Sequence, residues 1–283
     1  MRIASSLPFL FAALLASSVA AVGCKDGSKT DTDGLGAEAA ALVSDNDEAD
    51  EAEAELEAGI EEPLSGAVSG GEIDLSADDG GAAEKARTNA GVFFKPAGCI
   101  VSTRAANVVT HVFTNCTGPW GLTSFNGTVV STWSKTATGL QVVHKADDFK
   151  INGATVDHTV TIGYSKAGGV YTRTRNGAST GTTAAGKAIT HSASYVTTYD
   201  SIARCIKRDG SGSTTIGGAS FSRSIKGYER CGIGLGGCPK SGLITLSRPK
   251  LDVSLSFPGG PKVDITVNGK TYHRGLLCNA SAT

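Results

Sequence analysis

The sequence predicts an all-β protein: an antiparallel meander, curled into a barrel-like sheet or folded into a sandwich, stapled by disulfides and preceded by a disordered acidic tether. Three observations support this prediction. Apolar and polar residues alternate along successive segments after residue 90, which is typical of half-buried strands. Short glycine-containing turns separate these segments, as in antiparallel meanders. Six cysteines are spread over the same region, where they can form disulfides.

The strands can be recognised individually. Alternation is strict over 156–164, 189–199, 251–257 and 263–267. Asn268 and Gly269 follow the last of these segments, and both residue types tolerate the positive φ that a type I′ hairpin turn requires. We expect about ten to twelve strands and no helix after Arg87. The body of the chain is long enough for one sizeable core.

The N-terminus has the features of an export signal. A basic Arg2 precedes an apolar run, Leu7 to Leu15, and small residues follow it, so residues 1–23 are predicted to be a signal peptide. Ala21-Val22-Gly23-Cys24 resembles a bacterial lipobox, in which the cysteine is lipidated and becomes the first mature residue. Lipidation of Cys24 would anchor the chain to the outer membrane or cell surface. The alternative is cleavage after Ala20 or Ala21, which leaves Cys24 as a thiol.

Charge divides the rest of the chain into two parts. From Cys24 to Ala86 it carries 19 Asp and Glu against three Lys, whereas Arg87 to Thr283 carries 22 Lys and Arg against eight Asp and Glu. Residues 24–88 are therefore predicted to be an acidic low-complexity tether, with transient helix over Asp47–Glu57. Residues 89–283 are the all-β domain. The tether is either a spacer or a segment that docks loosely on the basic body.

Cysteine parity supports lipidation, because six cysteines remain to pair if Cys24 carries lipid. Position along the chain favours Cys99 with Cys116, at the open end of one predicted hairpin. It also favours Cys231 with Cys238 around a glycine-rich loop, which leaves Cys205 with Cys278. Sequence alone allows fifteen pairings of six cysteines. The chain has no Cys-x-x-Cys pair and no histidines at metal-ligand spacing, so neither a metal site nor another cofactor is predicted.

Seven basic residues between the middle and the end of the body form a candidate anionic-ligand patch. The ligand would be an anionic envelope polymer, a lipid headgroup or extracellular DNA. The alternative is that a domain with few Asp and Glu is basic without binding any such ligand. The pattern does not predict a specific reader of nucleic acids, because exposed aromatics are hardly interleaved with the cations. The patch consists of Arg173, Arg175, Lys207, Arg208, Arg223, Lys226 and Arg230.

Catalytic patterns are weak. His144 precedes Asp147-Asp148, and Asp157 precedes His158, so an imidazole and a carboxylate would share a face if these segments paired. An extracellular hydrolase with a His/Asp site on the sheet is therefore the alternative function. Residues 177–181 match G-x-S-x-G, but a nucleophile elbow needs a strand-to-helix turn, and we expect a loop here. The preferred function is a non-enzymatic binding or structural domain, with no catalytic residue assigned.

Several short segments resemble uncharacterised lipoproteins of myxobacteria. They are 114–121 (TNCTGPWG), 227–231 (GYERC) and Cys238-Pro239. The resemblance extends over roughly Cys99 to Cys278 and includes the lipobox-like segment. It implies an all-β fold and no particular activity.

Overall fold

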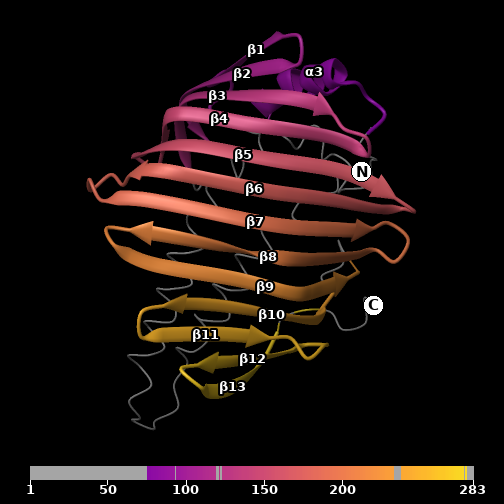
Figure 1. The fold of residues 1–283 in the computed structure, drawn as a ribbon, viewed down its shortest axis with the longest axis vertical. Coiled ribbons are helices and arrows are strands. Elements are labelled where there is room, and N and C mark those ends of the chain that lie inside the picture. The colour runs from indigo at the N-terminus through magenta and orange to yellow at the C-terminus, as the bar shows by residue number, and fades with distance from the viewer. Residues whose placement is uncertain are drawn as a thin grey trace. The chain divides into compact units, whose positions relative to one another are not determined.

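The computed structural model of the chain describes residues 75–92, 94–118, 121, 123–232, 237–276 and 278. Thirteen strands form one antiparallel sheet in which every strand is hydrogen-bonded to its neighbours in the sequence (Figure 1). The strands are β1 (Ile100–Ala105), β2 (Val108–Thr117), β3 (Ser124–Lys135), β4 (Gly139–Ile151), β5 (Ala154–Ala167), β6 (Val170–Thr182), β7 (Ala188–Asp200), β8 (Cys205–Ile216), β9 (Ala219–Cys231), β10 (Pro239–Arg248), β11 (Leu251–Ser256), β12 (Lys262–Val267) and β13 (Lys270–Gly275).

The predicted all-β, disulfide-stapled antiparallel meander is confirmed. The order β1 to β13 is that of a single open sheet, because the first and last strands are not hydrogen-bonded neighbours. It corresponds neither to a closed barrel nor to a sandwich of two sheets. The turn after β12 forms as predicted, since Asn268 and Gly269 have φ values of 45° and 84°, both in the left-handed region that a type I′ turn uses.

Two compact units make up the described chain. The first contains 75–194 and 215–218, and the second contains 195–214 and 219–278. Strands β7 and β8 therefore contribute residues to both units.

The first unit buries two apolar clusters on one face of the same strands. One cluster is aromatic: the Phe113 ring lies 5.1 Å from that of Phe94 and 5.4 Å from that of Phe149, both edge to face. The other cluster is built around Trp133 and contains aliphatic residues of β2, β4 and β5. Alternating side chains point to the same side of a strand, so β2 to β5 contribute to both clusters.

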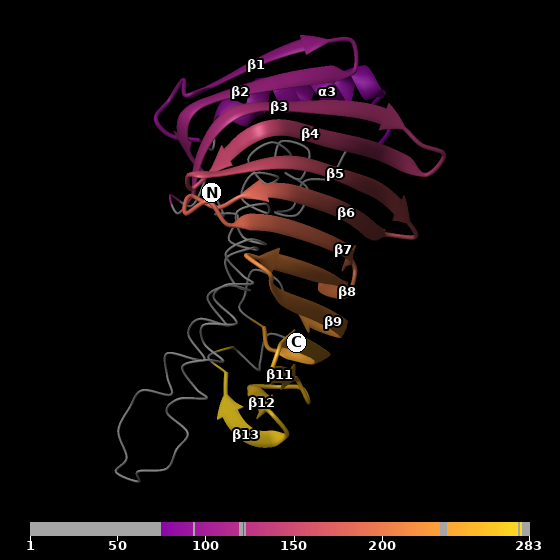
Figure 2. The same ribbon diagram turned by 60° about the vertical axis from the view of Figure 1, so that its left-hand side comes forward.

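Helix α3 (Asp79–Asn89) packs against the Trp133 cluster (Figure 2). Its contact face consists of Ala82, Ala83 and Ala86, which are fully buried. Asp78 caps the helix, because its side chain accepts a hydrogen bond of 2.5 Å from the Gly81 backbone. The predicted boundary of the tether is therefore wrong at its C-terminal end, since residues from α3 onward that were assigned to 24–88 are part of the folded unit.

Polar contacts fix the helix further. Lys135 of β3 donates hydrogen bonds to the carbonyls of Leu75 and Ala77. Glu84 accepts from Arg87 at 2.5 Å and from Arg104 of β1 at 3.3 Å. The hydrogen bond from Arg87 is the main reason why the pKa of Glu84 is lowered to about 2. The signal segment, Cys24 and the expected transient helix at Asp47–Glu57 lie outside the described residues.

Strands β9 to β13 of the second unit have one apolar and one polar face. In register, the apolar face has one row with Ile225, Ile244, Leu255 and Ile265. The opposite face has Ser224, Thr245, Ser254, Thr266 and Thr271 in consecutive register positions. Successive residues of a strand face opposite sides, so this two-sidedness follows directly from the alternation in the sequence.

Three disulfides are present, and each joins two cysteines of the same unit. The predicted Cys99–Cys116 bond is confirmed in the first unit. The other two predicted pairings are wrong: the second unit contains Cys205–Cys231 and Cys238–Cys278. Cys205 begins β8 and Cys231 ends β9, so the antiparallel hairpin brings them together at its open end. The prediction paired Cys231 with Cys238 because a short glycine-rich segment separates these two cysteines in the sequence.

Candidate anion-binding site

The seven cations predicted to form one patch come from three strands and from both units. Arg173 and Arg175 belong to β6 in the first unit, whereas the other five lie on β8 and β9 in the second. Arg175 and Arg223 are buried, with 6% and 7% of their surface exposed. They lie in register with Ile162 and Leu246, respectively. The two arginines therefore belong to apolar faces rather than to an open cationic surface.

Neighbouring groups engage most of the remaining cations in the second unit. Lys207 Nζ lies 3.4 Å from Glu229 Oε2, and the Arg230 Nε donates to the Gly237 carbonyl at 2.6 Å. The Arg208 guanidinium lies 4.4 Å above the centre of the Tyr195 ring. Lys226 is exposed. Burial and local pairing therefore leave few of the seven residues as open cations.

A smaller group on β13 has the features that an anion-binding surface needs. Lys270, Tyr272 and Arg274 alternate along the strand and so share a face. Lys270 Nζ lies 5.3 Å and Arg274 Cζ 5.9 Å from the centre of the Tyr272 ring. Both cations are exposed, and Tyr272 is half-buried. Two cations beside one aromatic ring can bind an anionic group while the ring contacts its apolar part.

The opposite side of the same hairpin carries a carboxylate that is hydrogen-bonded to an imidazole. His273 lies between Tyr272 and Arg274 on β13, so it points to the other side of the strand. The distance between its Nδ1 and Oδ1 of Asp264 on β12 is 2.7 Å. The carboxylate and the imidazole therefore interact with each other on that face. The face that carries Lys270 and Arg274 has no carboxylate paired with either cation among the residues that the structure describes.

The first unit contains three serine–histidine pairs on its buried face. Ser102 lies opposite His111, Ser131 opposite His144, and His158 opposite Ser179 in the strand register. In each pair the hydroxyl oxygen is 2.8 Å from the imidazole Nδ1. The pairs form polar links between β1 and β2, β3 and β4, and β5 and β6.

His111 is the most constrained of these histidines. It is fully buried, and burial lowers its pKa to about 3, with a further contribution from the nearby His144. The imidazole is therefore neutral at physiological pH. Its Nε2, like the Nε1 of Trp133, is buried without a hydrogen-bond partner among the residues that the structure describes. Unsatisfied buried nitrogens of this kind are costly and are commonly satisfied by water.

The arrangement proposed for a hydrolase site is not formed. His144 and His158 lie on the buried face, whereas Asp147, Asp148 and Asp157 are exposed on the strands. The Asp157 carboxylate instead accepts a hydrogen bond of 2.9 Å from the Asp148 backbone. Because Asp157 and His158 are adjacent in a strand, they point to opposite sides of the sheet.

The G-x-S-x-G segment is a strand and not the predicted loop. It lies within β6, where Ser179 pairs with His158. A β-carbon on Gly181 would lie 2.0 Å from the Thr155 carbonyl oxygen, so glycine allows β5 to approach closely. The geometry is that of regular strand pairing, without the exposed turn that a nucleophile elbow requires.

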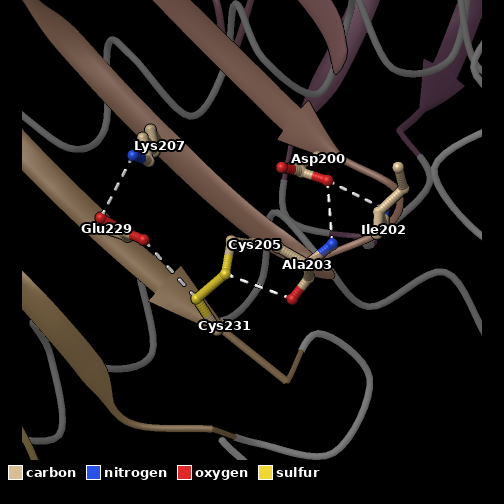
Figure 3. The surroundings of a disulfide bond; sticks show 7 residues. All are labelled: Asp200, Ile202, Ala203, Cys205, Lys207, Glu229 and Cys231. Carbon is tan, nitrogen blue, oxygen red and sulfur yellow. Dashed lines mark hydrogen bonds and ion pairs between the residues drawn. A yellow bond between two sulfur atoms is a disulfide. The ribbon is translucent and has the colours of Figure 1, made fainter. Parts of the chain in front are cut away.

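The disulfide between β8 and β9 has a charged environment (Figure 3). Glu229 Oε1 lies 3.8 Å from Cys231 Sγ, and its other oxygen faces Lys207. Cys205, Glu229 and Cys231 are close enough together to be considered as metal ligands. Because the two sulfurs are bonded to each other, however, the group offers only a carboxylate to a cation, and thiolates are the ligands that make such a site bind tightly.

The turn that precedes this disulfide is built by Asp200. Its Oδ1 accepts hydrogen bonds of 2.9 Å from the backbone nitrogens of Ile202 and Ala203 (Figure 3). An aspartate that binds nitrogens two and three residues later stabilises a tight turn. Asp200 therefore has a structural role, and it places Cys205 at the start of β8.

Two groups of residues escaped the sequence analysis. The pairing of Ser102, Ser131 and Ser179 with histidines was not predicted, because it depends on strand register. Lys270 and Arg274 were overlooked because basic residues are denser in β8 and β9, although their alternation with Tyr272 is visible in the sequence.

Comparisons with protein-family models, with curated proteins and with solved structures find no match for this chain. In the part of the chain that the structure describes, no helix is long and apolar enough to cross a membrane.

Proposed function

We propose that this chain is an exported, lipid-anchored envelope protein that binds an anionic ligand and is not an enzyme. The observation that carries the proposal is the β13 group, in which Lys270 and Arg274 flank Tyr272 on one face. The part of the second unit that the structure describes contains twelve Lys and Arg against five Asp and Glu. Such an excess attracts anionic polymers and lipid headgroups.

Export is supported by the three disulfides, because disulfides persist in oxidising compartments. The lipobox-like segment ending at Cys24 and the resemblance to myxobacterial lipoproteins support a lipid anchor. Detergent phase partitioning of the wild type and of Cys24→Ala tests the anchor. We expect the wild type in the detergent phase and the variant in the aqueous phase, and wild-type protein in the aqueous phase would contradict the proposal.

Binding can be tested with heparin as a model anionic polymer. The variant Lys270→Glu/Arg274→Glu is compared with Lys250→Glu/Lys262→Glu, which makes the same change in charge elsewhere in the second unit. We expect the first variant to elute at lower salt than the control and to lower the salt slope of binding by about two, roughly one for each lost contact. Equal losses in both variants would show general charge attraction and would refute a site on β13.

A further inference from the structure

The disulfide between Cys205 and Cys231 has a carboxylate at a fixed position beside it. Glu229 lies two residues before Cys231 on β9, so both side chains point to the same side of the strand. Cys205 begins the neighbouring strand β8, and the potential ligand atoms of the three residues all lie within 4.8 Å of one another. The three residues belong to the second unit, so their arrangement does not depend on the first.

The spacing of these atoms suits a zinc ion. The distance between Glu229 Oε1 and Cys231 Sγ is 3.8 Å. A thiolate at about 2.3 Å and a carboxylate oxygen at about 2.1 Å from Zn²⁺ lie about 3.6 Å apart when the ligands are tetrahedral. The Cα atoms of Cys205 and Cys231 are 4.0 Å apart, so both sulfurs can stay beside Glu229 after their bond is broken. Two thiolates and one carboxylate leave the fourth position of such a site to water.

The surroundings of the disulfide also accommodate the two thiols that reduction produces. The Ala203 carbonyl oxygen lies 3.3 Å from Cys205 Sγ, and Glu229 Oε1 lies beside Cys231 Sγ (Figure 3). Each thiol therefore has a hydrogen-bond acceptor, and reduction leaves neither of them as a buried donor without a partner. The side chain of Glu229 is 27% exposed, whereas both cysteines are buried. A cation can thus reach the sulfurs by way of the carboxylate.

We propose that Cys205, Cys231 and Glu229 form a redox-gated site for a thiophilic divalent cation, with Zn²⁺ as the expected ion. The disulfide form offers a cation only the carboxylate. Reduction by a dithiol breaks the S–S bond, transfers two electrons and two protons to the cysteines and converts the dithiol into a disulfide. Zn²⁺ then binds as the two thiols release their protons. The inference goes beyond the proposed function and does not rest on it.

Oxidation reverses the process and releases the ion. The disulfide of an oxidase or of a small thiol accepts two electrons from the metal-bound thiolates and, with two protons from solvent, becomes two thiols. The bond between Cys205 and Cys231 forms again, and Zn²⁺ leaves because it has lost both of its soft ligands. Metal occupancy of the chain is therefore coupled to the redox state of its surroundings.

Cobalt(II) is the first probe, because thiolate ligands give this ion a charge-transfer absorption band. The full chain with Cys24→Ala, which has no thiol at position 24, is reduced without oxygen and titrated with Co²⁺. We expect one Co²⁺ per reduced chain, with the band of two thiolates, and displacement of the ion by Zn²⁺. The oxidised chain should show no band. A reduced chain without the band would overturn the proposal.

Substitutions distinguish a metal ligand from a structural residue. Glu229→Gln keeps the shape of the side chain and removes its charge, and we expect the affinity for Co²⁺ to fall at least tenfold. Asp252→Asn removes an exposed carboxylate of the same unit, and this control should bind like its parent. Lys207→Met should raise the affinity, because it removes the cation that lies 3.4 Å from Glu229 Oε2. Equal affinity in Glu229→Gln and its parent would refute the site.

A second measurement uses no variant of the site. The reduced protein is treated with iodoacetamide in the presence and absence of Zn²⁺, and the alkylated peptides are quantified by mass spectrometry. We expect Zn²⁺ to slow alkylation of Cys205 and Cys231 and to leave that of Cys99 and Cys116, which belong to the aromatic cluster of the first unit, unchanged. Equal protection of all four cysteines, or of none, would overturn the proposal. A reduced chain that unfolds gives one of these two results.

The gate is tested by adding oxidised glutathione to the Zn²⁺-loaded protein. We expect one Zn²⁺, measured with a chromophoric chelator, to be released for each bond formed between Cys205 and Cys231. Zn²⁺ that stays bound after the bond has formed would refute the redox gate. The heparin comparison on β13 involves none of these residues, so failure of the metal site leaves the proposed function intact.

Discussion

The two units of this sheet stabilise the same kind of strand in different ways. The first unit buries aromatic rings and serine–histidine pairs, and an alanine-faced helix packs against its Trp133 cluster. The described part of the second unit has a buried aliphatic face, an excess of positive charge and two of the three disulfides. The same meander is thus stabilised by aromatic packing and a helix in one unit, and by aliphatic packing and more covalent links in the other. The sharpest tests of this difference perturb one unit at a time.

The largest effect is expected from Trp133→Ala in the first unit. Trp133 is fully buried in the cluster that α3 covers, and truncating such a residue costs about 3–5 kcal/mol. Denaturant unfolding should show this loss. Val101→Ala, at an exposed position of β1, is the control and should change the free energy of unfolding by less than about 0.5 kcal/mol. A similar loss in both variants would mean that packing on the Trp133 face is not what stabilises the unit.

A comparable but separate loss is expected in the second unit from Cys205→Ala/Cys231→Ala. These cysteines close a loop of 26 residues, for which the chain-entropy relation gives about 3.5 kcal/mol. Hydrogen exchange should become faster in β8 and β9 and remain unchanged in β2 to β5. Equal acceleration across both groups of strands would show that the two units unfold as one and would contradict the comparison.

A smaller effect should accompany acidification and arise in the first unit. His111 has a folded pKa of about 3 against an ordinary value near 6.5, so the unfolded chain binds more protons between these values. The stability that comes from keeping His111 neutral is present above pH 6.5 and is lost as pH falls towards 3. Between pH 7 and pH 5 the loss is about 2 kcal/mol.

The His111→Gln variant should show a flatter dependence of unfolding free energy on pH in this range, whatever its absolute stability. Glu84 contributes little to the pH dependence of the unfolding free energy in this range, because its lowered pKa affects stability mainly below pH 4.5. An unchanged slope in the variant would show that His111 does not titrate on unfolding as described.

The fold was predictable from sequence wherever the signal is local. Alternation identified the strand at 263–267, and Asn268-Gly269 identified the turn that follows it, because both depend on adjacent residues. Helix α3 was missed because its buried face consists of alanines, which give no strong apolar periodicity and lie next to an acidic low-complexity segment. The Cys205–Cys231 bond was missed because it depends on how β8 and β9 end together. The hairpin argument that correctly paired Cys99 with Cys116 applies equally to β8 and β9.

The candidate site was less predictable than the fold. The basic residues were identified, but their exposure depends on which face each strand buries, and Arg175 and Arg223 lie on buried faces. His144 and His158 were placed with nearby carboxylates by sequence proximity, whereas register pairs them with Ser131 and Ser179. Sequence proximity gives the residue types available, and strand register decides which of them meet.

The order of the cysteine pairs has a consequence for assembly. After Cys24, the first cysteine is bonded to the second, the third to the fourth and the fifth to the sixth. A chain that crosses a membrane with its N-terminus first presents these partners to an oxidising compartment one pair after another. An oxidase that joins each newly arrived cysteine to the one left unpaired before it would form every native bond without reshuffling. Each strand also pairs with its sequence neighbours, so the sheet can grow at the same pace as the chain emerges.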